Sequence, residues 1–228
     1  MKKKNLFFMV LLHCSFIFGQ ENDYSFIRKA INQYWSTLPY GKNWTCSRSS
    51  VLQEKSKSSD FYEYDKAFDN NLETVWVEGV PGNGINEYIM ANICQKDLCN
   101  FNYRKAKKNN GINIFLSLNN GYCKNESLFI KNNRIKKAHV IIYDTPIAIG
   151  QDTTKIDDNP IIIYDEIIDL KDTMDEQTFS FVINTREDNI YSSPFVIMQF
   201  IILDVYPGTD YDDTCISEIK VYGEYANE

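Results

Sequence analysis

The chain reads Tyr-Asp-Lys-Ala-Phe-Asp-Asn-Asn-Leu-Glu-Thr-Val-Trp-Val-Glu-Gly-Val-Pro-Gly-Asn-Gly-Ile-Asn-Glu-Tyr-Ile over residues 64–89, and this stretch carries three signals. Trp76 lies in a short apolar run, which favours a place in the core over a role as a stacking surface for a sugar. A carboxylate-rich turn precedes it at residues 69–74, and a glycine-rich loop follows at residues 79–84. A core residue flanked by polar loops is typical of binding sites on β-sandwiches.

Outward from this stretch, the chain consists of strand-like segments. They are rich in β-branched and aromatic residues and are bounded by Gly, Pro, Asn or Asp. About eight are expected: one within residues 47–57, then 87–94, 112–118, 135–143, 161–170, 178–183, 195–205 and 215–222. This pattern predicts an all-β fold, an antiparallel β-sandwich or jelly roll.

The first residues have the composition of a secretory signal. Three lysines precede an apolar run at residues 6–18, which is too short to cross a bilayer, and Gly19 ends it. We expect a signal peptide at 1–19, a helical segment at 20–45 with an amphipathic pattern over residues 26–38, and one sandwich domain at 46–228. The mature chain is then secreted, periplasmic or held at the cell surface.

Net charge and cysteine spacing argue against nucleic acid and zinc as partners. Losing the three lysines of the signal changes the formal net charge from -7 to 21 minus 31, or -10, which argues against nucleic acid. Five cysteines remain after cleavage: Cys46, Cys94, Cys99, Cys123 and Cys215. Their odd number leaves at least one thiol unpaired within the chain, and Cys94 and Cys99 are spaced for a bridge across a loop. Their spacing does not suit a zinc site.

Two motifs resemble the factor five/eight type C, or discoidin-like, family. That family has an Ala-x-Asp-Gly-x-x-x-Thr-x-Trp pattern, matched by Ala67, Asp69, Thr74 and Trp76, and a final Ser-Glu-Ile strand, matched at residues 217–219. Further motifs resemble its NAD glycohydrolase translocation branch, also called NADase-type glycan-binding domains. They lie at residues 77–79, 82–87, 120–122, 132–136, 204–208, 211–214 and 216–219. The sequence departs from the family glycines at Asn70 and Asn86.

This resemblance implies a galactose-binding-domain-like sandwich that binds a ligand and has no catalytic activity. The ligand is expected to be a glycan or glycoconjugate on a surface. The polar and aromatic residues in the shared motifs suit sugar recognition. They are Glu78, Asn83, Glu87, Asn120, Tyr122, Asn132, Arg134, Tyr211 and Asp212. Two simpler roles remain open: residues 119–121 make a good hairpin turn, and Arg134 could form an ion pair with Glu78 or Glu87.

The carboxylate-rich turn also predicts a metal site. Asp69, Asn70, Asn71 and Thr74 bring oxygen donors together, and calcium prefers six to eight such donors in a flexible loop. Glu218 would join them if the last strand pairs with the first strands. The family resemblance points to Asp69, Thr74 and Glu218 as ligands of a structural Ca²⁺. The alternative is a turn closed by its own Asx hydrogen bonds.

Catalysis is the competing interpretation. His139 is the one histidine after the signal and lies in an alternating strand, so no Ser-His or Cys-His arrangement can be built. A carboxylate pair, Glu78 with Glu87 or Asp212, could support a hydrolase of glycans or nucleotides. A protein-binding envelope module that uses the N-terminal helix is a third possibility.

Overall fold

The computed structural model describes residues 45–92, 111–144, 147–149, 154–156, 161–183 and 196–225. The expected signal peptide, nearly all of the N-terminal helical segment, Cys94 and Cys99 lie outside them. Within the described parts of the chain, no helix has the length and apolar character needed to span a membrane.

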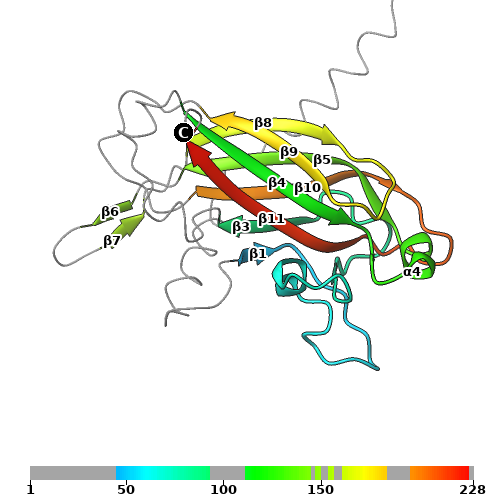
Figure 1. Cartoon of the computed structure of the whole chain (residues 1–228). Coiled ribbons are helices and arrows are strands. Elements are labelled where there is room, and N and C mark those ends of the chain that lie inside the picture. The colour runs from blue at the N-terminus through cyan, green and yellow to red at the C-terminus, as the bar shows by residue number, and fades with distance from the viewer. Residues whose placement is uncertain are drawn as a thin grey trace, which may run out of the picture.

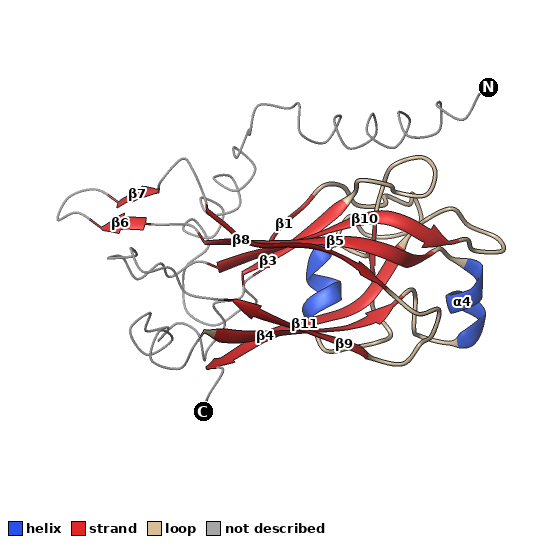
Figure 2. Ribbon diagram, turned by 90° about the horizontal axis from the view of Figure 1, so that it is seen from above, coloured by secondary structure: helices blue, strands red, loops and turns tan. Residues whose placement is uncertain are grey.

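Two antiparallel sheets pack face to face, as the sequence predicts (Figures 1 and 2). The five-stranded sheet has the order β1 (Thr45–Arg48), β3 (Tyr88–Asn92), β10 (Val196–Tyr206), β5 (Arg134–Asp144) and β8 (Ile161–Asp169). The four-stranded sheet has the order β2 (Trp76–Val77), β11 (Cys215–Tyr225), β4 (Ile112–Asn120) and β9 (Gln177–Ile183). A separate hairpin pairs β6 (Ile147–Ile149) with β7 (Thr154–Ile156).

Alternating side chains create the shared core. In β4, Ile112, Ile114, Leu116 and Leu118 point between the sheets and are buried, because successive residues of a strand face opposite sides. Trp76 joins them with no exposed surface, and its indole Nε1 donates to Ser50 O at 3.1 Å. The expectation that this tryptophan belongs to the core is therefore confirmed.

Two short helices complete the described structure. The 3₁₀ helix η1 (Tyr64–Phe68) precedes the carboxylate-rich turn and buries Ala67. Helix α4 (Glu126–Lys131) lies at one end of the sandwich (Figure 2), where Asn125 Oδ1 accepts from Leu128 N at 2.9 Å and caps it. The loops before β3, after β4 and before β11 meet at this end.

Both positions where asparagine replaces a family glycine have left-handed backbone. Asn70 has φ 59° and Asn86 has φ 72°. Asparagine tolerates this conformation better than most residues with a side chain, because its short amide bonds locally. The turn and the loop therefore keep left-handed positions without glycine.

Candidate functional site

Asn133 joins the loops at the α4 end of the sandwich. Its Nδ2 donates to Asp212 O at 2.6 Å and to Asn83 Oδ1 at 3.3 Å, and its Oδ1 accepts from Gly208 N at 2.6 Å. The side chain is 1% exposed. One buried amide thus ties the glycine-rich loop to both sides of the loop between β10 and β11. Asn133 lies inside the motif at 132–136 but is not among the predicted ligand-binding residues.

Glu78 makes a second tie between the same loops. Its Oε2 accepts from Val80 N at 2.8 Å and its Oε1 accepts from Thr214 N at 3.2 Å. The carboxylate has no exposed surface. Burial raises the pKa of Glu78 to about 7, because the charged form is poorly solvated, although the two backbone donors oppose the shift. The residue therefore supports the loops from below rather than facing solvent.

Glu87 lies nearby, directly before β3, and is half-buried. Its carboxylate accepts from the hydroxyl groups of Ser49, at 2.5 Å, and of Ser50. Ser50 Oγ in turn accepts from Gly79 N at 2.8 Å. These contacts connect the glycine-rich loop to the segment that follows β1.

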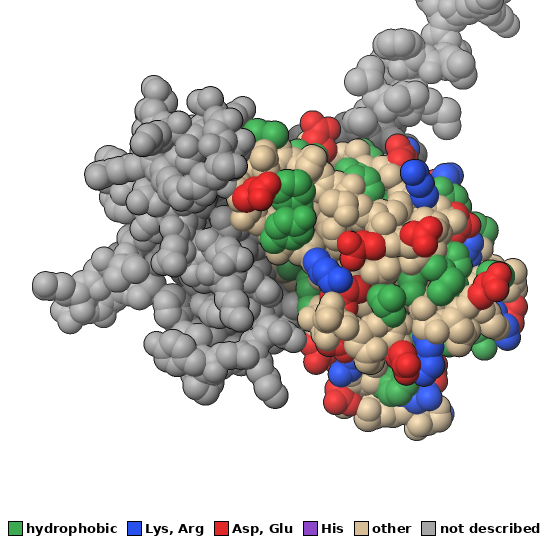
Figure 3. All heavy atoms as spheres, in the orientation of Figure 1, with side chains coloured by type: hydrophobic (Ala, Val, Ile, Leu, Met, Phe, Trp, Pro, Cys, Tyr) green, Lys and Arg blue, Asp and Glu red, His purple; other side chains and the backbone are tan. Residues whose placement is uncertain are grey.

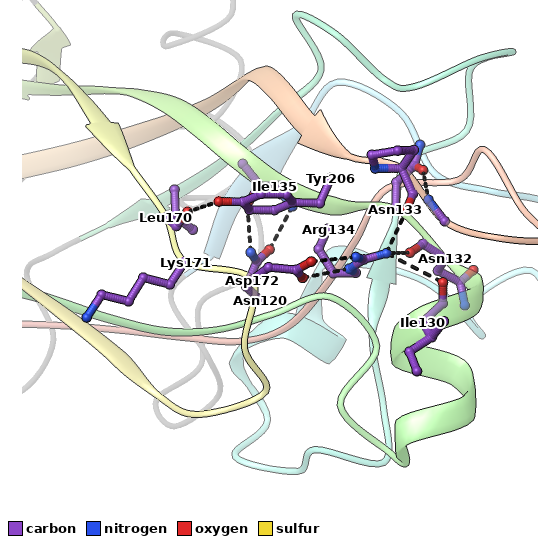
Figure 4. A network of polar contacts seen from close by, with 12 residues as sticks. Asn120, Ile130, Asn132, Asn133, Arg134, Ile135, Leu170, Lys171, Asp172 and Tyr206 are labelled. Atoms are coloured by element: carbon purple, nitrogen blue, oxygen red, sulfur yellow. Dashed lines mark hydrogen bonds and ion pairs between the residues drawn. The ribbon is translucent and has the colours of Figure 1, made fainter.

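Arg134 forms its ion pair with Asp172, a residue absent from the sequence-based candidates (Figure 4). Its Nε and Nη2 donate to the two carboxylate oxygens at 3.0 and 2.7 Å, a bidentate arrangement. Its Nη1 donates to the carbonyls of Asn132 and Pro207, each at 3.0 Å. Arg134 is 7% exposed and is held entirely by the protein, so the structural ion pair left open by the sequence exists, but with Asp172 and not with Glu78 or Glu87.

Asn120 and Asn132 are also hydrogen-bonded internally. Asn120, with no exposed surface, accepts from Ile135 N at 2.8 Å and donates to Ile135 O at 2.6 Å. Asn132 caps the end of α4 and donates to Leu128 O at 2.8 Å. Residues 119–121 do not form a hairpin turn: Gly121 instead makes a bridge to Ile216 of β11. The turn expectation failed because the chain continues into α4 before it reaches β5.

Three of the predicted ligand-binding residues are exposed together at this end, and we name them the loop surface: Asn83, Tyr211 and Asp212. Tyr211 is 49% exposed. The buried side chain of Asn133 bonds to the side chain of Asn83 and to the backbone of Asp212. Together with buried Glu78 and Arg134 it forms a hydrogen-bonded frame that holds the exposed groups in place. An aromatic ring beside an amide and a carboxylate can stack on a sugar ring and hydrogen-bond its hydroxyl groups.

Tyr122 lies in a different cluster. It packs with Leu52 and Tyr62 against a small apolar group made of Val75, Val77 and Cys215. We name the three outer side chains, Leu52, Tyr62 and Tyr122, the tyrosine patch; each is half-buried. Tyr122 Oη donates to Glu73 O at 3.4 Å.

The three residues predicted to bind metal converge on one turn. Thr74 Oγ1 donates to both carboxylate oxygens of Asp69, at 2.9 and 2.8 Å, and Asn71 N lies 3.0 Å from Asp69 Oδ1 and 3.2 Å from Glu218 Oε2. Pairing of β11 with β2 brings Glu218 to this turn, as expected. Burial, followed by the charge of Asp69, raises the pKa of Glu218 to about 7.

The side-chain atoms of Asp69, Thr74 and Glu218 that could ligate a metal are all oxygens, which suits a hard cation such as Ca²⁺. Two carboxylates that repel one another also fit a bound cation, because it would relieve the repulsion. Among the residues that the structure describes, no three His, Cys, Asp or Glu side chains gather as a metal-binding group. A calcium ion here would therefore need the Thr74 hydroxyl or further neutral oxygens beside Asp69 and Glu218.

His139 and two cysteines are the remaining candidates. His139 of β5 pairs with Asp165 of β8, with 2.5 Å between Nε2 and Oδ1. Cys123 and Cys215 are buried free thiols. The pairing of the other three cysteines is outside what the structure describes.

The fold and the loops at the α4 end define the chain as a discoidin-like β-sandwich. The model of the NAD glycohydrolase translocation F5/8 type C domain family matches residues 39–222, and the chain belongs to this family. A comparison with curated proteins finds no match.

Among solved structures, the chain is similar to an F5/8 type C domain from Bacteroides fragilis, with 12% identity and a TM-score of 0.42, covering 78% of this chain and 89% of that one. It is also similar to CBM32-1 from a family 31 glycoside hydrolase of Clostridium perfringens, with 12% identity and a TM-score of 0.36, covering 80% and 91%. A family 89 glycoside hydrolase from the same organism has 14% identity and a TM-score of 0.31, and here the similarity covers 78% of this chain but 14% of that one.

Proposed function

We propose that this chain is an exported, non-catalytic module that binds carbohydrate on a surface. The observation that carries the proposal is the loop surface, which exposes an aromatic ring, an amide and a carboxylate on a buried, hydrogen-bonded frame. Binding sites of this kind need few polar groups, but these must be held in place before the ligand arrives. Asn133, Glu78 and Arg134 supply that support.

The hydrolase alternative is less well supported by the same geometry. Glu78 would have to reach a substrate, yet it has no exposed surface and both of its oxygens accept backbone N–H groups. Glu87 is engaged by two serine hydroxyl groups. The carboxylate pair is better explained as part of the frame of the loops.

A glycan array followed by calorimetry on any hit tests the proposal. Tyr211→Ala is expected to weaken binding at least about tenfold, because stacking and burial of a tyrosine ring are lost. Tyr222→Ala is the matched control. Tyr222 is 50% exposed, close to the 49% of Tyr211, but it stacks on Phe115 with ring centroids 4.9 Å apart.

Tyr222 and Phe115 lie opposite one another in β11 and β4 and face away from the core, since the neighbouring Val221 packs against it. Figure 3 shows the outer face of this sheet, where hydrophobic side chains lie among scattered charges of both signs. The proposal fails if no glycan binds. It also fails if Tyr222→Ala weakens binding as much as Tyr211→Ala does.

We also propose that Asp69, Thr74 and Glu218 hold a structural Ca²⁺. The support is their convergence on one turn and the repulsion between the two carboxylates. The ion would neutralise that repulsion and fix the turn beside β2 and β11.

A further inference from the structure

The tyrosine patch is a second surface at the edge of the four-stranded sheet. Leu52 N donates to Val77 O at 3.0 Å, and Val77 N donates to Tyr62 O at 3.4 Å, so the segment 51–62 is fastened along β2. Tyr122 follows the buried Gly121 and reaches the same cluster. The result is a pair of half-buried phenol rings on a shared apolar floor.

Carboxylates border this patch. Tyr62 Oη donates to Glu54 Oε1 at 3.1 Å. Burial raises the pKa of Asp213, and the negative charges of Glu54 and Asp212 raise it further. Glu54 therefore lies close enough to Asp213 for the two charges to interact. Among the described residues, no Lys, Arg or His forms an ion pair with Glu54, Asp212 or Asp213. The patch therefore combines aromatic faces with carboxylates that form no ion pair with any described cation.

We propose that the tyrosine patch binds a sugar unit that carries a free, protonated amino group. Aromatic faces attract both sugar C–H groups and cations, and the carboxylates attract an ammonium group. The same charges repel sulfated glycans and uronic acids. This inference rests on the proposed function and narrows its ligand class.

Continuity with the loop surface favours a glycan as the occupant. Asp212 belongs to the loop surface, and the next residue, Asp213, borders the tyrosine patch. An oligosaccharide held at Tyr211 can therefore extend along the loop between β10 and β11 toward Tyr122. Binding at two adjacent places on one chain of sugars would add to affinity.

Calorimetry with two matched oligosaccharides tests this inference on the full mature chain. One is a β-1,4-linked glucosamine tetramer at mildly acidic pH, and the other is the same tetramer with every amine acetylated. The charged tetramer is expected to bind about tenfold tighter at low salt, and the preference should shrink to about threefold near 0.15 M ionic strength because exposed charges are screened.

A variant without the carboxylates that border the tyrosine patch tests whether they cause the preference for the charged tetramer. Glu54→Gln combined with Asp213→Asn should abolish the preference while leaving the affinity for the acetylated tetramer within about twofold, since that tetramer has no ammonium group for these carboxylates to attract. Glu166→Gln removes one exposed carboxylate from β8 and should keep the preference. Melting curves of each variant check that it is folded.

The outcomes separate the two proposals. Equal or tighter binding of the acetylated tetramer, or a preference that survives in the double variant, overturns the inference and leaves carbohydrate binding intact. A lysine tetrapeptide that binds as tightly as the charged tetramer also overturns it, because the patch would then be a general cation site. If neither tetramer nor any other glycan binds, the proposed function itself fails.

Discussion

Replacing Glu78 by glutamine should change stability in opposite directions at low and high pH. In the folded chain the pKa of Glu78 is about 7, against an ordinary value of 4.5. The folded state therefore holds a proton that the unfolded state releases between these values, so the free energy of unfolding falls as pH rises through this window. The full shift corresponds to about 3 kcal/mol, and relaxation around the charge reduces this to about 2 kcal/mol.

The Glu78→Gln variant avoids burying a charge but loses a hydrogen bond. Glutamine keeps one acceptor oxygen, so one of the two backbone N–H groups of Val80 and Thr214 loses its partner. That loss costs about 1 kcal/mol at any pH. Below about pH 4.5 the variant should thus be less stable than the wild type, and above about pH 8 it should be more stable by about 1 kcal/mol.

Urea unfolding of both proteins at a series of pH values measures this difference directly. Glu166→Gln is the control, since this exposed carboxylate on β8 has no hydrogen bond or ion pair among the described contacts and should leave the difference near zero throughout. A difference between wild type and Glu78→Gln that stays constant from about pH 4.5 to pH 8 would show that the carboxylate is not buried in the folded chain.

Three further predictions concern the turn and the loops. In the wild type a chelator should lower the melting temperature, and Asp69→Ala should remove that effect; an unchanged wild-type melting curve would exclude calcium. Gly121→Ala should lower the free energy of unfolding in urea by about 3 kcal/mol, because φ is +79° and the new Cβ would lie 2.5 Å from Arg134 Cγ. Gly82→Ala is the matched control: φ is +99°, but no atom lies within 4 Å of the new Cβ, so the loss should be about 1 kcal/mol. Asn133→Ala should cost about 1 to 3 kcal/mol by leaving Gly208 N and Asp212 O, both part-buried, without their side-chain partner, and similar stability of wild type and variant would contradict its role as the organiser of the loops.

The sandwich was predictable because its signals repeat along the chain. Alternation in β4 and the apolar run around Trp76 identify inward residues without knowledge of the topology. The proximity of Glu218 to Asp69 followed from one assumption, that the last strand pairs with the first strands, and β11 does pair with β2. Regular periodicity thus fixes which residues face the core.

The frame of the loops was not predictable in the same way. Asn133 and Asp172 act through contacts with residues distant in sequence, and short polar side chains have no periodic signature. Asn120 looked like a turn residue because turn propensity is local, while its actual role depends on a backbone partner across the fold, Ile135. Sequence motifs located the loop residues but could not say which of them face solvent.

Two Asn-Gly sequences, at Asn83 and Asn120, differ in how readily they should deamidate when the protein is stored. Asparagine before glycine is prone to lose its amide nitrogen and become aspartate, because glycine leaves the following nitrogen unhindered. At Asn120 this would remove the amide hydrogen that Ile135 O accepts, but burial and both hydrogen bonds hold the side chain in place. At the exposed Asn83 the acceptor toward Asn133 would survive as a carboxylate. Stored protein should therefore gain negative charge at the loop surface while Asn120 and its hydrogen bonds in the core stay intact. The proposed sugar binding should then change before the melting temperature does.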